Sequence, residues 1–68
     1  MDDPIIQVEV ALNFVNSLLA KAVYFKDDDF RKELSGIRHS IYYDGDFNYE
    51  SIIKKLQEIS KILDEKYE

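Results

Sequence analysis

The chain has 68 residues, no cysteine and a formal net charge of −5 at pH 7. This length allows one small domain, residues 1–68, and the lack of cysteine excludes a core held by disulfides or thiolate-bound metal. The acidic balance argues against direct binding of nucleic acid, which needs a basic patch, and is compatible with a basic protein partner or simply with solubility.

The N-terminal segment, residues 4–25, is predicted to form one long helix against which the rest of the chain packs. Asp3 and Pro4 suit a helix start, because an acidic side chain accepts free amide groups and proline at the first helical position loses no hydrogen bond. Apolar or small residues cover roughly 220° of this helix, about twice the usual stripe. A strand over residues 6–10, where polar and apolar residues alternate, is the alternative. The polar residues fall on one narrow strip: Glu9, Asn13, Asn16 and Ser17.

The same segment also bears on membranes and localisation. Its start is acidic, unlike the positively charged start of a signal peptide. The longest uncharged run, residues 10–20, is shorter than the ~18–20 residues that cross a bilayer. We therefore expect a cytoplasmic protein without a membrane partner.

The second helix is predicted over residues 29–43, after a polar break at residues 26–29. Its apolar residues recur in steps of four, three and four, which marks one face of a helix. Gly36 interrupts this pattern, either by ending the helix and leaving 37–43 as a separate segment, or by allowing two helices to approach closely. The apolar residues are Phe30, Leu34, Ile37 and Ile41.

The third helix is predicted over residues 49–66, with Asn48 as its N-cap. Before it, Asp44-Gly45 is the strongest turn signal in the chain. Residues 40–49 form either a loop between helices or a β-hairpin, and the loop is favoured because an isolated two-stranded hairpin gains little stability. Three helices with short links predict an all-α, antiparallel three-helix bundle. The apolar face of the third helix comprises Ile52, Leu56, Ile59 and Leu63.

The apolar surface of the first helix is wider than the two later stripes can cover. Each stripe spans about 100° at best, so apolar residues on the flanks of the first helix are expected to stay uncovered. Such residues would form a homodimer surface. They are Val10, Phe14, Leu19 and Val23.

Candidates for catalysis and metal binding are weak. His39 is the single histidine, and it lies opposite the apolar face of the second helix, where a surface role is the usual one. The alternating oxygens from Asp44 to Glu50 resemble the opening of a calcium loop. A loop read from Asp44 has Tyr49 where glycine is needed and Lys55 where a bidentate glutamate is needed. We expect no enzyme activity, no metal and no cofactor.

A cluster of aromatic and acidic residues lies between the second and third helices. Tyrosine is enriched at protein interfaces because it contributes a large area and a hydroxyl group at low entropic cost. The alternative is that some of these rings only cap the open end of the bundle. The candidate binding residues are Tyr42, Tyr43, Asp44, Asp46 and Glu50.

At these residues the sequence resembles the immunity proteins of nuclease-type colicins and pyocins. Those are small, acidic helical bundles with a tyrosine pair, an acidic loop and an Ile-rich last helix. Here residues 41–43 match the tyrosine pair, Asp44 and Asp46 the loop, and residues 48–54 the start of the last helix. Arg31, Lys32 and Arg38 stand where that family has acids along its second helix. The match covers about a quarter of the chain.

Two functions are therefore expected as alternatives. The resemblance and the aromatic–acidic cluster imply a protein-binding module, an inhibitor or immunity-type antagonist that masks a basic nuclease or nucleic-acid-binding protein. The wide apolar arc of the first helix instead indicates a homo-oligomeric structural or assembly subunit. The oligomeric state separates the two.

Overall fold

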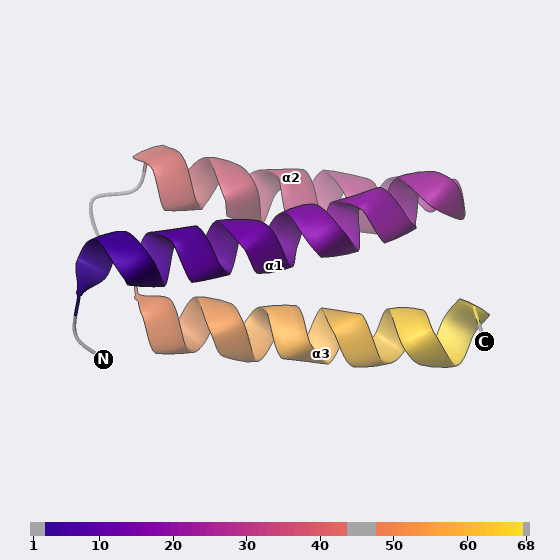
Figure 1. The fold of residues 1–68 in the computed structure, drawn as a ribbon. Coiled ribbons are helices and arrows are strands. Elements are labelled where there is room, and N and C mark those ends of the chain that lie inside the picture. Colours follow the sequence, from indigo (N-terminus) through magenta and orange to yellow (C-terminus); the bar gives the residue numbers. More distant parts are fainter. Residues whose placement is uncertain (1–2, 44–47, 68) are drawn as a thin grey trace.

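Three α-helices make up almost all of the computed structural model, which describes residues 3–43 and 48–67 (Figure 1). Helix α1 spans Pro4–Tyr24, α2 spans Asp28–Tyr43 and α3 spans Tyr49–Tyr67. The predicted all-α class is confirmed, and each expected helix boundary lies within one residue of the observed one. No strand occurs in the described ranges, so the strand expected as an alternative over 6–10 is wrong. The hairpin alternative is also wrong, because residues 40–43 belong to α2.

The start of α1 follows from the sequence. Asp3 is the N-cap, its Oδ1 accepting a hydrogen bond from the Ile5 amide at 2.9 Å, and Pro4 occupies the first turn. The start of α3 is built in the same way, since Asn48 Oδ1 accepts from the Ser51 amide at 3.0 Å. Both caps satisfy amides that have no partner inside the helix.

The end of α1 is a reversal that depends on Lys26. This residue adopts the left-handed conformation, with φ of 57°. The Lys26 amide donates to the Val23 carbonyl at 3.1 Å and the Asp27 amide to the Ala22 carbonyl at 2.8 Å. These two bonds form a Schellman motif, which usually has glycine at the position of Lys26. The chain then enters α2 directly.

Helix α2 continues through Gly36 without interruption. Neither role expected for this glycine is observed, because the helix does not end there and a Cβ added at Gly36 would meet no atom within 4 Å. Apolar residues on both sides of the glycine pack against the core: Phe30, Leu34, Ile37 and Ile41. Packing therefore offsets the low helix propensity of glycine.

The core is organised around α1, as the sequence predicts. Helix α1 packs closely against both α2 and α3, whereas α2 and α3 meet mainly through long side chains such as Lys66 on Phe30 and Lys55 beside Glu33. Half of the buried apolar residues belong to α1, and they face the space shared by the other two helices. The buried set is Ala11, Val15, Leu18, Leu19, Ala22, Leu34, Ile41, Leu56, Ile59 and Leu63.

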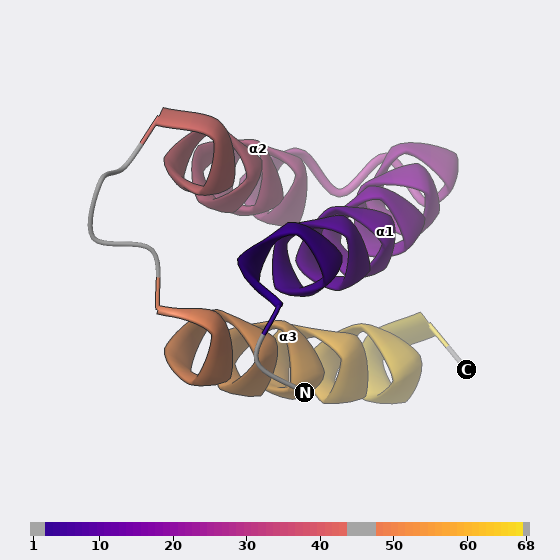
Figure 2. The same ribbon diagram turned by 60° about the vertical axis from the view of Figure 1, so that its left-hand side comes forward.

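The order of the helices brings distant parts of the chain to the same ends of the molecule. In Figure 1, α2 returns along α1, and α3 then runs in the direction of α1. The start of α1, the end of α2 and the start of α3 therefore share one end, which Figure 2 also shows. The end of α1, the start of α2 and the end of α3 share the other.

Among the described residues, α1 is one helix that is long and apolar enough to cross a membrane by length and composition. A core helix of a soluble protein and a signal sequence meet the same criterion. In this structure the apolar face of α1 supplies half of the bundle core. The opposite face carries the predicted polar strip, which is exposed: Glu9, Asn13, Asn16 and Ser17.

Candidate functional site

Two tyrosines project from the last turn of α2. Tyr42 is 62% exposed and Tyr43 is 77% exposed, and the centroids of their rings are 6.1 Å apart. The exposed ring of His39 lies one turn earlier, with its centroid 4.5 Å from that of Tyr43. The three rings form an aromatic surface that takes no part in the bundle core.

The outward direction of both tyrosines follows from the residue before them. Ile41 is buried, and successive residues of a helix point about 100° apart. With Ile41 in the core, Tyr42 and Tyr43 are turned away from it. Tyr42 and Tyr43 therefore do not cap the open end of the bundle, whereas Tyr49, at the start of α3, is half-buried.

Acidic residues share this end of the molecule. Glu50 is exposed in the first turn of α3, and Asp3 caps α1 at the same end (Figures 1 and 2). Asp44 and Asp46, also expected at the site, lie outside the described residues. Asp3 was not predicted as part of the site, because its place depends on the order of the helices. We call His39, Tyr42, Tyr43, Glu50 and Asp3 the tyrosine end.

The four residues expected to form a dimer surface do not share one environment. Val10 and Val23 are exposed and Phe14 is half-buried, whereas Leu19 is only 8% exposed. The expectation that Leu19 stays uncovered is wrong, because α2 packs over this flank of α1. Val10 and Val23 are about 140° apart around the helix axis, so they do not make one continuous patch.

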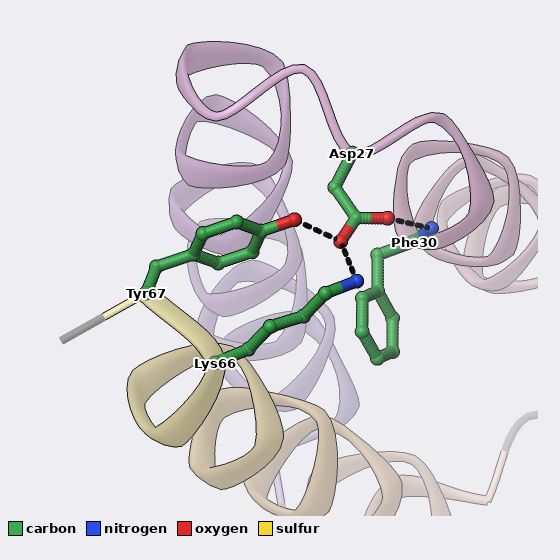
Figure 3. A network of polar contacts seen from close by, with 4 residues as sticks. All are labelled: Asp27, Phe30, Lys66 and Tyr67. Carbon is green, nitrogen blue, oxygen red and sulfur yellow. Dashed lines mark hydrogen bonds and ion pairs between the residues drawn. The ribbon is translucent and has the colours of Figure 1, made fainter.

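A second polar cluster lies at the opposite end of the bundle, around the buried carboxylate of Asp27 (Figure 3). Its Oδ1 accepts a hydrogen bond from the Phe30 amide at 3.1 Å and so caps α2. Its Oδ2 accepts from Lys66 Nζ at 2.7 Å and from the Tyr67 hydroxyl at 2.5 Å. We call Asp27, Lys66 and Tyr67 the Asp27 clamp, because it fastens the end of α3 to the link between α1 and α2.

Aromatic rings surround the clamp. The Tyr67 ring stacks on Phe25 with 4.3 Å between centroids and 5° between planes. Lys66 Nζ lies 5.6 Å from the centroid of the Phe30 ring and 5.3 Å from that of Tyr67, within the range of cation–π attraction. Sequence patterns did not predict this cluster, because it joins residues 39 and 40 positions apart.

The clamp fixes the ionisation of its members. The hydrogen bond from Lys66, with those from Tyr67 and the Phe30 amide, lowers the pKa of Asp27 from 3.8 to about 2. The hydrogen bond to Asp27 raises the pKa of Lys66 and also that of Tyr67. A general acid or base works best with a pKa near the operating pH. All three shifts move the pKa values away from neutral pH, so Asp27 and Lys66 are both charged at pH 7 and pair as opposite ions.

Metal ligands do not gather in the part of the chain that the structure describes. Across residues 3–43 and 48–67, no three His, Cys, Asp or Glu side chains are placed to hold a metal ion. The stretch that resembles a calcium loop, residues 44–50, falls mostly outside these ranges.

No family model, curated protein or solved structure matches the chain. The likeness to immunity proteins therefore stays an expectation from residues 41–54. The tyrosine end has two neighbouring exposed tyrosines, with Glu50 and Asp3 at the same end of the bundle.

Proposed function

We propose that this protein is a small acidic binding module, an inhibitor or immunity-type antagonist that masks a basic protein partner with its tyrosine end. The observation that supports this most is the exposure of Tyr42 and Tyr43 side by side. A 68-residue domain has little apolar area to spare for its core. Two neighbouring aromatic side chains left in solvent therefore indicate a surface used for binding.

Charge and location also support the proposal. Glu50 and Asp3 lie at the same end as the two rings, and the chain as a whole carries a net charge of −5. Complementary charge raises the rate at which a basic partner associates, and aromatic anchors slow its release. The sequence between α2 and α3 is acidic as well. Together these features favour a basic nuclease or nucleic-acid-binding protein in the cytoplasm as the partner.

Affinity capture from host lysate tests the proposal with three immobilised baits: the wild type, Tyr42→Ala/Tyr43→Ala and Tyr24→Ala. Tyr24 is the matched control, because it is 79% exposed and lies at the end of α1, away from the tyrosine end. We expect a basic protein to bind the wild type and Tyr24→Ala, and its affinity for the double variant to fall at least about tenfold. Circular dichroism checks that each bait is folded. Equal affinity for all three baits would refute the proposal.

The second candidate is a homo-oligomeric structural or assembly subunit that associates through α1. Its support is the exposure of Ile5, Ile6, Val10 and Val23 on that helix. Against it, the polar strip of α1 runs between Val10 and Val23. Sedimentation equilibrium at micromolar concentration decides: a strict monomer removes this candidate, and a tight dimer that Val10→Asp dissociates makes it the leading one.

A further inference from the structure

A groove whose lining residues all belong to α1 and α2 is a candidate for a second binding surface. Its volume is about 540 Å³. The apolar part consists of Leu19, Ala20 and Val23 from α1, and the polar part of Asn16, Arg31, Ser35 and Arg38. A concave apolar surface with a few convergent polar groups is typical of binding sites.

The two arginines give the groove a positive charge in an acidic protein. Arg38 Nη1 donates to Asn16 Oδ1 at 3.2 Å, and Arg38 forms no ion pair with any acid in the described ranges. Arg31 Nε lies 3.5 Å from Asp28 Oδ1, in an exposed pair that water screens. Each guanidinium group has five N–H donors and therefore keeps donors for a carboxylate beside the contact it already makes. Arginine is also among the residues that contribute most to interface affinity.

The spacing of the arginines indicates the shape of the acidic ligand. Arg31 and Arg38 are seven residues apart on α2, which is about 10.5 Å along the helix axis. This separation matches two carboxylates better than one. A second helix laid along the groove can do so with two acids seven residues apart, and its apolar side chains would rest on Leu19, Ala20 and Val23.

We propose that this groove binds an amphipathic helix of another protein, with Asp or Glu at two positions seven residues apart beside apolar residues. The groove shares no lining residue with the tyrosine end, although Arg38 lies one helical turn before Tyr42, and the inference does not depend on the proposed function. A second copy of this chain fits less well. On α3, Glu58 and Glu65 have the right spacing beside the exposed Ile62, but Lys61 lies between them and would face the arginines.

A displayed library of helical peptides, randomised on one face and selected on the wild-type protein, tests this inference. We expect the selected peptides to carry Asp or Glu at seven-residue spacing with Leu, Ile or Phe between. The variant Arg31→Glu/Arg38→Glu should bind them at least about tenfold more weakly. The control Lys32→Glu/Lys54→Glu changes the net charge equally, at exposed lysines that do not line the groove, and should keep the affinity. Peptides with lysine in place of the two acids should bind the Arg31→Glu/Arg38→Glu variant, which restores the charge pairing.

Four results would overturn the inference. Selected peptides without an acidic preference, or with equal affinity for both charge-reversed variants, would show that the arginines are not used. Displacement of the peptides by octanoate at similar affinity would assign the groove to a small carboxylate. NMR shifts at Leu19 and Val23 that change with protein concentration alone would assign it to a second copy. The Tyr42→Ala/Tyr43→Ala variant should bind the peptides normally, so failure here is distinct from failure of the proposed function.

Discussion

Asp27 stabilises the fold in its charged form, and the free energy of unfolding therefore depends on pH in the acidic range. Its pKa is about 2 in the folded protein against an ordinary value of 3.8. A carboxyl group whose pKa is lowered by folding contributes stability above the ordinary value and loses it as the pH falls toward the folded value. The contribution of Asp27 is therefore present above its ordinary pKa of 3.8, falls as the pH decreases toward about 2 and is lost below that value.

Replacing Asp27 with Asn should lower the melting temperature at pH 7 and flatten its dependence on pH between 2 and 4. Asn keeps a cap for α2 but cannot pair its charge with Lys66. Thermal unfolding followed by circular dichroism at a series of pH values measures both effects. Asp29→Asn is the control, since Asp29 is exposed in the first turn of α2. An unchanged acid slope in Asp27→Asn would contradict the assigned role.

At the scale of secondary-structure elements, the chain places two residues against local preference. Lys26 occupies a left-handed position that favours glycine, and Gly36 occupies the interior of α2, where alanine is preferred. We expect Lys26→Gly and Gly36→Ala each to raise the free energy of unfolding by about 1 kcal/mol. The added Cβ at residue 36 has space, because no atom lies within 4 Å of its position.

Urea unfolding of the two single variants and of their combination measures these effects. Lys26 lies in the link before α2 and Gly36 lies in the interior of that helix, and the two share no hydrogen-bond partner, so their effects should add. Gly36→Pro, which removes a helical hydrogen bond at the same position, should destabilise the protein and shows that α2 is the element affected. A loss of stability in Gly36→Ala would contradict the placement of this residue on an open helix surface.

The helices could be predicted from the sequence because their signals are local. Apolar spacing in α2 and α3 and the caps at Asp3 and Asn48 depend on neighbouring residues only. The turn at Lys26 could not be predicted, since lysine rarely adopts the left-handed conformation. The Asp27 clamp and the burial of Leu19 depend on how separate helices lie against each other. At the candidate site, the exposure of Tyr42 and Tyr43 follows from the apolar pattern once Ile41 is assigned to the core.

For the molecule as a whole, the single small core limits what substitution the fold tolerates. Leu34 is fully buried and is one of only two buried apolar residues that α2 contributes. Replacement of a buried leucine by alanine lowers the free energy of unfolding by about 2–5 kcal/mol, and a domain of this size rarely has more than about 3–5 kcal/mol from its core. Leu34→Ala should therefore be largely unfolded at 37 °C.

Urea unfolding at low temperature, where the variant stays folded, measures the effect of Leu34→Ala. Ile62→Ala is the control, because Ile62 is exposed on α3 and its truncation should change the free energy of unfolding by less than about 0.5 kcal/mol. If Leu34→Ala were as stable as Ile62→Ala, the packing of α2 on α1 would differ from that described.

The separate attachment of α2 and α3 to α1 has a consequence for recognition. The tyrosines belong to α2 and Glu50 to α3, and these helices are joined through α1 more than through each other. Side-chain volume inside the core, at a fully buried residue such as Ala11, therefore sets the spacing between rings and carboxylate. A substitution in the core, which no partner touches, would then change the distance between the tyrosines and Glu50 and with it the affinity for each partner. Binding specificity could therefore change in evolution while every residue in contact with the partner stays the same.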